Sequence, residues 1–541
     1  MYKTIICHIL GWLLLSTSMA FANNIEIENV SLADKDAVGN TYDIEFDISW
    51  DNSWYYGSSS PDNYDAAWVF AKFSKYSGGA WSEWAHCTLS SNDTDHVAPA
   101  GSTIDVGLTT TGKGVFIHRD SPGNGSNNWD NAQIRWAYGA DGVGDFENVR
   151  IKVFGIEMVY VPQGPFYIGD TDNDQNGNFF TADGSFVEDE VGLPQYTITS
   201  EGAITVGTTA GNLYYDAETG NTGDQAGPIP ALFPKGYNDF YIMKYELTQG
   251  QYVDFLNTLN GTQQANRISA VTAGTFMDDV APGAGAPQDR NGVVCKVAPV
   301  SAKPGVYAND LDNDGVYNES TDGKWIAANY LSWMDGAAYA DWAALRPFTE
   351  LEFEKAARGP QLMVDDEYAW GSTEITQAEG NPPTNFGEAS EVPTTTGNGL
   401  CNYDGAGTDT IGPLRVGFAA TGATNRIQSG GGYYGAMELS GNVWEQPVTV
   451  GNDTLGPQVG GRAFDGAQGN GALSAGGFAD VETWPGYNTG TTIVDGARGS
   501  GLRGGGWANS TYNLVSDRQF SALGSSDRQL HIGFRCARTA P

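Results

Sequence analysis

The chain has 541 residues, of which 40% are hydrophobic, 12% are aromatic and only 17% are charged. A sequence this rich in apolar and aromatic residues is not that of a disordered protein. The formal net charge of −37 excludes the basic surface that nucleic-acid binding or adhesion to an anionic membrane requires. Such a charge is compatible with an exported protein that binds calcium.

Residues 1–22 have the features of a secretory signal peptide. Lys3 supplies a positive charge, residues 5–15 are apolar, and residues 20–22 (Ala-Phe-Ala) match a small-x-small cleavage site. The apolar run is too short to span a bilayer comfortably, so we expect cleavage rather than an uncleaved anchor. The mature chain is then expected to begin at Asn23 and to be secreted or periplasmic, without a membrane span.

Residues 23–155 are predicted to form an all-β domain. Residues 42–50 alternate apolar and polar side chains without a fault, which is typical of a half-buried strand. Gly-, Ser-, Asn- and Asp-rich turns separate further strand candidates at residues 68–73, 114–118, 134–138 and 149–154. Several short strands with turn signals between them favour a β-sandwich.

Helical patterns begin after residue 156. Thr248 and Gln251 form a capping box before an amphipathic run, and Thr349 and Glu352 form another before a helix that is expected to end at Gly359. A third helix is expected to begin at Ser332.

Few helices and long Gly-, Asn- and Asp-rich connections predict an α+β domain over residues 156–541. The stretches near residues 170–235, 260–300 and 450–500 look like insertions into this domain. Four cysteines remain after signal cleavage: Cys87, Cys295, Cys401 and Cys536. In an exported protein they permit two disulfides, and the sequence does not choose between the three connectivities.

Seven segments of the C-terminal two-thirds occur in an order that identifies a family. They are residues 158–169, 240–248, 345–359, 368–371, 439–445, 502–507 and 532–536. Together they resemble the formylglycine-generating enzyme, or sulfatase-modifying factor, family. The resemblance implies a variant of the C-type lectin fold for residues 156–541, and the N-terminal sandwich has no part in it.

The residues that carry the family's reaction are different here. The resemblance implies a copper-binding cysteine pair a few residues after the glycine-rich turn, but those two positions fall on Asn509 and Leu514. Neither an amide nor an isobutyl group is a redox ligand or a nucleophile. A relocated pair from Cys295, Cys401 and Cys536 is the alternative. Only His531 lies in this part of the mature chain, so we expect neither copper nor iron.

Calcium is the expected cofactor, since the family's calcium positions are occupied by oxygen donors. The resemblance places one site at the side chains of Glu438 and Glu445 with the backbone carbonyls of Gly441 and Val443. A second family site matches the amide oxygen of Asn385 and the carbonyl of Phe386, with Asp404 or Asp409 as a poorly placed third ligand.

An aspartate-rich loop provides a further calcium candidate that is independent of the resemblance. Asp310, Asp312 and Asp314 stand at alternate positions before Gly315, as in the opening of an EF-hand loop. The twelfth position is Thr321 rather than Glu, with Asp322 beside it. Solvated turns are the alternative interpretation of such loops.

The segment after the glycine-rich turn is expected to line a surface groove. Its aromatic, amide, hydroxyl and guanidinium groups suit a peptide, protein or glycan ligand: Trp507, Asn509, Ser510, Tyr512 and Arg518. We therefore expect a binding protein rather than an enzyme. The alternatives are an oxygen-dependent oxidoreductase of the same superfamily with a divergent site, and a surface-assembly component.

Overall fold

The computed structural model describes residues 24–57, 62–106, 112–170, 178–184, 194–215, 227–277, 285–300, 303–378, 383–405, 412–421, 424–451, 457–519 and 524–540. The expected signal peptide at residues 1–22 lies outside these ranges, as does Asp409. Among the described residues, no helix is both long enough and apolar enough to cross a lipid bilayer.

The N-terminal strands form a three-stranded antiparallel sheet in the order β1-β2-β8. Its members are β1 (Glu26–Asp36), β2 (Thr41–Tyr55) and β8 (Gly123–Trp136). The alternation predicted for residues 42–50 is confirmed, because Ile44, Phe46, Ile48 and Trp50 are all buried on one face of β2.

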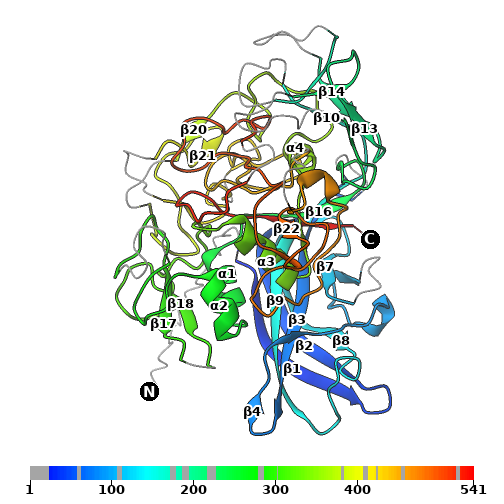
Figure 1. Cartoon of the computed structure of the whole chain (residues 1–541). Helices are drawn as coiled ribbons and strands as arrows, with labels where there is room; N and C mark the ends of the chain where they lie inside the picture. The colour runs from blue at the N-terminus through cyan, green and yellow to red at the C-terminus, as the bar shows by residue number, and fades with distance from the viewer. Residues whose placement is uncertain are drawn as a thin grey trace, which may run out of the picture.

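A second sheet, of nine strands, contains both N-terminal strands and strands from the later part of the chain; β3, β7, β9 and β16 of this sheet are labelled in Figure 1. Its main path is β19-β24-β16-β9-β3-β7-β6, and β4 and β5 also pair with β3. The members are β3 (Asp65–Ser77), β4 (Ala80–Trp81), β5 (Ala85–His86), β6 (Ser102–Asp105), β7 (Val115–Arg119), β9 (Asn148–Val161), β16 (Phe240–Met243), β19 (Arg346–Pro347) and β24 (Cys536–Thr539).

Strand β3 is buried on both faces. Ala67, Val69 and Ala71 pack against the three-stranded sheet, and the alternate residues Trp68 and Phe70 join the larger core that contains the helices. This double burial explains the continuous apolar run in its sequence. The N-terminal strands therefore share both a sheet and a core with the rest of the chain.

The boundary expected between residues 155 and 156 falls inside β9, which pairs with β3 along one edge and with β16 along the other. In its coarser form the expected mixed fold is confirmed, since the described residues form several sheets and four α-helices. A separate N-terminal sandwich is not confirmed.

The four helices are labelled in Figure 1. They are α1 (Gln249–Leu256), α2 (Gly261–Arg267), α3 (Trp333–Trp342) and α4 (Glu350–Arg358). Residues of α1, α3 and α4 pack in the same hydrophobic clusters as strands of the large sheet. The capping boxes predicted at Thr248 and Thr349 are confirmed, and Ser332 caps α3 as expected. The sequence does not predict helix α2, because its residues GTQQANR show almost no apolar periodicity. The beginning of this helix is stabilised by the Asn260 side chain, which caps it.

Short strands organise the long connections into small sheets. They are β10 (Phe166–Ile168), β11 (Phe180–Thr181), β12 (Tyr196–Ile198), β13 (Ile204–Val206), β14 (Leu213–Tyr214), β15 (Gly227–Ile229), β17 (Val293–Val297), β18 (Val306–Asn309), β20 (Thr376–Gln377), β21 (Leu400–Cys401), β22 (Tyr487–Asn488) and β23 (Ile493–Val494).

The four cysteines are free and buried, so the disulfides that the sequence permits are not formed in the structure. The thiols lie in different parts of the core: Cys87 packs with the three-stranded sheet, Cys401 with α4, and Cys295 and Cys536 in the largest cluster. Burial raises the pKa of each of these thiols. They are therefore neutral packing groups rather than nucleophiles.

A buried ion triad joins the N-terminal strands to the later ones. The ammonium of Lys244, which follows β16, lies 3.0 Å from Asp65 Oδ2 on β3 and 3.0 Å from Glu157 Oε2 on β9. It also donates to the carbonyl of Asn52. All three charged side chains are nearly inaccessible to solvent.

Replacing Lys244 by Met is expected to lower the free energy of unfolding by about 3–5 kcal/mol, because two buried carboxylates lose their shared counter-charge. Lys75→Met is the matched control, since Lys75 makes a half-exposed pair with Glu147 at 3.7 Å that is worth about 0–1 kcal/mol. Urea unfolding of the mature chain measures both. Equal losses in the two variants would contradict a structural role for the triad.

Candidate functional site

A surface pocket of about 540 Å³ lies where the sequence predicts a binding groove. Residues 510–514 contribute to its lining, together with Asp366, Tyr368, Thr373 and Asp517 from other parts of the chain. The pocket therefore combines hydroxyl, amide, carboxylate and aromatic groups. Such a lining suits a polar ligand that also offers an apolar face.

The backbone at the pocket is held in an unusual conformation. Tyr512 has a positive φ of 68°, and its ring centroid lies 5.7 Å from that of Trp444. Gly505 also has a positive φ, and a Cβ atom at this position would stand 2.0 Å from Asn513 Oδ1. The glycine-rich turn thus allows the following segment to fold closely over it.

The predicted ligand-binding residues divide into two groups. Ser510 and Tyr512 line the pocket, and Asn509 lies next to them with its side-chain oxygen accepting a 2.7 Å bond from Trp444 Nε1. Trp507 and Arg518 are buried instead. Trp507 donates to the carbonyl of Leu530, as expected of a packing residue.

Arg518 belongs to the interior of the protein, not to the groove. Its guanidinium makes two hydrogen bonds to Glu350, at 2.7 and 2.9 Å, and lies over the ring of Phe179. A guanidinium held in this way is not presented to a surface ligand. The sequence could not reveal this pairing, because Glu350 lies 168 residues earlier in the chain.

Several residues that line the pocket were not predicted from the sequence. They include Asp517 within the 507–518 stretch and, from the segment after α4, Asp366, Tyr368 and Thr373. Tyr368 begins one of the seven ordered segments, but nothing in its local sequence indicates that it faces a pocket. Only the packing of this segment against residues 510–514 brings it there.

Three buried glutamates surround the 438–445 loop. The carboxylate of Glu246 accepts bonds from the backbone amide of Val443 and the side chain of Asn442. Glu438 Oε1 accepts a bond from the amide of Gly417 at 2.9 Å. Glu445 Oε1 pairs with Arg535, whose Nε lies at 2.6 Å.

These carboxylates are short of partners. Glu438 Oε2 and Glu445 Oε2 are buried and have no hydrogen-bond donor among the described residues. Burial raises the pKa of Glu438 to about 8 and that of Glu445 to about 7, and it also raises the pKa of Glu246. A buried carboxylate oxygen without a partner is costly, and a cation would satisfy it.

The residues present therefore fit the calcium expected at Glu438 and Glu445, because hard carboxylate oxygens are what this ion takes. The three glutamates are not brought into one close cluster, so backbone carbonyls such as those of Gly441 and Val443 would have to complete the shell. Gly441 has a φ of 81° and lies so close to Cys401 Sγ that a Cβ would stand 2.4 Å from it. Only glycine permits this tight passage.

The second family position receives less support from the geometry. Asn385 is exposed with a φ of 57°, and its amide nitrogen donates weakly to the carbonyl of Ser390 at 3.4 Å. The ring of Phe386 lies under the guanidinium of Arg290. Asp404 is exposed, and no group of three or more metal-binding side chains forms around Asn385 within the described ranges.

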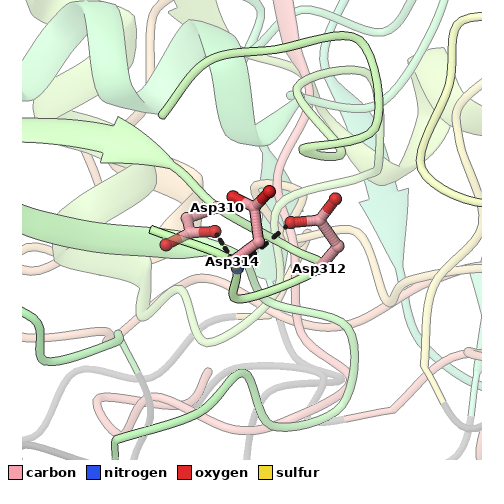
Figure 2. Close-up of side chains that lie close together, drawn as sticks. All are labelled: Asp310, Asp312 and Asp314. Atoms are coloured by element: carbon pink, nitrogen blue, oxygen red, sulfur yellow. Dashed lines mark hydrogen bonds between the residues drawn. The ribbon is translucent and has the colours of Figure 1, made fainter. Parts of the chain in front are cut away.

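Asp310, Asp312 and Asp314 do come together. One carboxylate oxygen from each residue lies within 4.8 Å of the corresponding oxygens of the other two. Figure 2 shows the three side chains around one turn, with the amide of Asp314 donating to Asp310 and Asp312. Within the parts of the chain that the structure describes, no other group of at least three His, Cys, Asp or Glu side chains is this close.

Comparisons with known proteins agree with six of the seven ordered segments, because the first segment, residues 158–169, lies before the matched range. The family described as "Sulfatase-modifying factor enzyme 1-like domain" matches residues 192–540. The formylglycine-generating enzyme of Thermomonospora curvata is 28% identical over 235 residues, which cover 42% of this chain and 68% of that protein. The match begins after the N-terminal strands.

Without metal, the free energy of unfolding is expected to fall as the pH rises from about 4.5 to 8. A carboxyl group whose pKa is raised by folding stabilises the folded protein at pH values below its unfolded-state pKa. This stabilisation is lost as the pH rises through the folded-state pKa of the group. The folded values are about 8 for Glu438 and about 7 for Glu445.

Thermal unfolding in EGTA at a series of pH values checks this expectation. Across this pH range, the fall in the free energy of unfolding is expected to be smaller in Glu438→Gln than in the wild type by at least about 1 kcal/mol, because the amide does not ionise. Identical slopes for the variant and the wild type would contradict the assignment.

Proposed function

Because the chain belongs to the sulfatase-modifying factor enzyme 1-like family, we propose that it is an exported, calcium-stabilised member that binds a peptide or glycan and lacks formylglycine-generating activity. The observation that carries this proposal is the pocket at residues 510–514, whose lining contains hydroxyl, amide, aromatic and carboxylate groups but no thiol. Asn509 and Leu514 occupy the positions at which the family resemblance implies the catalytic cysteines.

The surroundings of the cysteines support the absence of thiol chemistry. Cys401 is the thiol connected most directly to the pocket wall, since its Sγ contacts the carbonyl of Ser440, and Ser440 Oγ donates to the carbonyl of Asn513. It is buried, and burial raises its pKa. A single buried neutral thiol does not replace an accessible pair of thiolates that binds copper.

The chemistry of the pocket supports binding of a peptide or glycan. The half-buried ring of Tyr512 and the ring of Tyr368 offer faces for an apolar group or a sugar ring. The exposed hydroxyl of Ser510 and the exposed carboxylate of Asp366 supply hydrogen-bond partners around them. A carboxylate favours ligands that offer donors, such as sugar hydroxyls or backbone amides.

Calcium at Glu438 and Glu445 would hold in place the residues that pack behind the pocket. Trp444, which lies between Val443 and Glu445, donates to Asn509 and packs against Tyr512. An ion that fixes the 438–445 loop thus also fixes the side chains behind the pocket. Export is proposed on the signal-like features of residues 1–22.

The lack of formylglycine-generating activity is tested with a cysteine-containing sulfatase peptide, in the presence of added copper. We expect no conversion of the peptide cysteine by the mature chain, because no accessible thiol pair is available. The Thermomonospora curvata enzyme is the positive control. Conversion at a rate comparable to that control would overturn the proposal.

Ligand binding is tested on peptide and glycan arrays with the mature chain, followed by titration of the best ligand. Tyr512→Ala is expected to weaken binding about tenfold or more, since it removes the aromatic face of the pocket. Tyr76→Ala is the matched control, because Tyr76 is 42% exposed and lies in β3, outside the pocket. Loss of binding in the Tyr76 variant alone would place the ligand elsewhere and contradict the pocket assignment.

A further inference from the structure

The loop between β18 and α3 contains four aspartates within thirteen residues: Asp310, Asp312, Asp314 and Asp322. Residues 309–323 all lie in a described part of the chain. The loop is distant in sequence from the 438–445 segment and lies outside the seven ordered segments of the family resemblance. Its ion-binding capacity is therefore a separate question from that of the Glu438 and Glu445 site.

The backbone of this loop turns in the way that an oxygen cage for a cation requires. Asp310 Oδ1 accepts bonds from the amides of Asp314 and Gly315, at 3.1 and 3.5 Å. Gly315 has a φ of 82°, at the position where an EF-hand loop needs glycine. The resulting turn points three carboxylates toward one another (Figure 2).

Three carboxylates at close range repel one another, and nothing positively charged lies among them. No Lys, Arg or His forms an ion pair with Asp310, Asp312 or Asp314 among the described residues. Acidic turns of this kind occur without an ion, so the cluster alone does not establish a site.

Asp322 supplies the independent observation. Its side chain is fully buried, and its Oδ1 has no hydrogen-bond partner, while Oδ2 accepts a 2.7 Å bond from the amide of Glu319. The preceding residue, Thr321, donates its hydroxyl to Asp312 Oδ2 at 2.7 Å, which ties this end of the loop to the cluster. The charges of Asp312 and Asp310 both act on the Asp322 carboxylate.

A buried carboxylate oxygen that has no donor is strongly unfavourable in the absence of a cation. Asp322 is not one of the three residues that each place a carboxylate oxygen within 4.8 Å of the others. The hydrogen bond from Thr321 to Asp312, together with the effect of the Asp310 and Asp312 charges on Asp322, places the Asp322 carboxylate beside that cluster.

We propose that residues 310–322 form a second Ca²⁺ site, in which Asp310, Asp312 and Asp314 are ligands at positions 1, 3 and 5 and Asp322 replaces the usual acidic residue at position 12. The EF-hand pattern adds the backbone carbonyl at position 7, here Val316. Thr321, which holds position 12, orients Asp312 through its hydroxyl.

The ligand set determines which cation is bound. All the side chains are carboxylates, and neither a histidine nor a cysteine takes part, which disfavours zinc and copper. A loop with four carboxylates and a carbonyl suits the larger, irregular shell of Ca²⁺ better than the strict octahedron of Mg²⁺.

The ion would also fix a neighbouring segment. The amide of Gly323 donates to the carbonyl of Gly387 at 3.0 Å, and the amide of Gly387 donates to Glu391. The carboxylate of Glu391 in turn accepts a hydrogen bond from the backbone amide of Arg415. Closing the 310–322 loop around Ca²⁺ therefore anchors the segment that carries Asn385 and Phe386.

The test is calcium titration of the mature chain by calorimetry after removal of metal with EGTA. The titration is expected to show one calcium ion bound per chain at the loop, and Glu438→Gln is expected to leave the binding of this ion unchanged. Asp314→Asn is expected to weaken the binding of this ion at least about tenfold, because it removes a charged ligand. Glu319→Gln is the matched control: it removes one exposed charge of the same loop but no proposed ligand. An equal effect of Asp314→Asn and Glu319→Gln, or no calcium equivalent that depends on Asp314, would overturn the site.

Asp322→Asn tests the fourth ligand. The substitution keeps the shape of the side chain, and an expected loss of at least about tenfold in affinity supports direct coordination. Wild-type affinity in this variant would overturn the role of Asp322. Terbium luminescence sensitised by Tyr317, at position 8 of the loop, identifies the site: Tyr317→Phe is expected to reduce the signal while calcium still binds.

Because this site does not depend on the proposed function, the two can fail separately. Loss of the calcium equivalent in Glu438→Gln but not in Asp314→Asn would support the family site and refute the loop site. The opposite pattern would support the loop site alone. Circular dichroism of each variant confirms that the fold is retained.

Discussion

The C-terminal part of this protein depends on the neutralisation of carboxylates that its fold buries. Helix α4 is the clearest case, since all nine of its residues are buried, including three glutamates. Each has an arginine partner: Glu350 pairs with Arg518, Glu352 with Arg346, and Glu354 with both Arg358 and Arg503. Removing one partner from a buried pair typically costs about 3–5 kcal/mol, so the fold requires these pairs to be complete.

The same pairing positions the surface pocket. Arg503 contacts Glu350 and Glu354 and donates to the carbonyl of Val515, and Arg518 is bound to Glu350. These two arginines lie at either end of the segment that contains residues 510–514. The pocket wall is thus a loop whose ends are fixed to a buried helix, which allows its middle to vary without loss of the fold. Such an arrangement would let the family scaffold persist with Asn509 and Leu514 at the positions where the resemblance implies the cysteines.

Where the arginines are insufficient, the structure leaves carboxylate oxygens without partners. Glu445 contacts the guanidinium of Arg535, whereas neither Glu438 nor Asp322 forms an ion pair among the described residues, and each of the three has one carboxylate oxygen without a hydrogen-bond donor. The proposed calcium ions would satisfy both sets of oxygens, one at the 438–445 loop and one at the 310–322 loop.

Local patterns in the sequence predicted local structure well. The alternation of residues 42–50 gave strand β2, and the capping pairs at Thr248 and Thr349 gave the starts of α1 and α4. Features that depend on distant residues were not predictable. The ion pair of Arg518 with Glu350, the continuity of β9 across residue 155 and the placement of Asp366 beside Tyr512 all arise from tertiary packing. The free cysteines belong to the same class, because their separation is set by the core.

Elemental analysis of the purified mature protein by inductively coupled plasma mass spectrometry tests the central claim most directly. Purification without chelators is expected to leave calcium at about two ions per chain, one for each proposed loop, and to leave neither copper nor iron in stoichiometric amount. Stoichiometric copper or iron, with calcium absent, would contradict an account in which calcium completes the charge balance and the pocket binds rather than reacts.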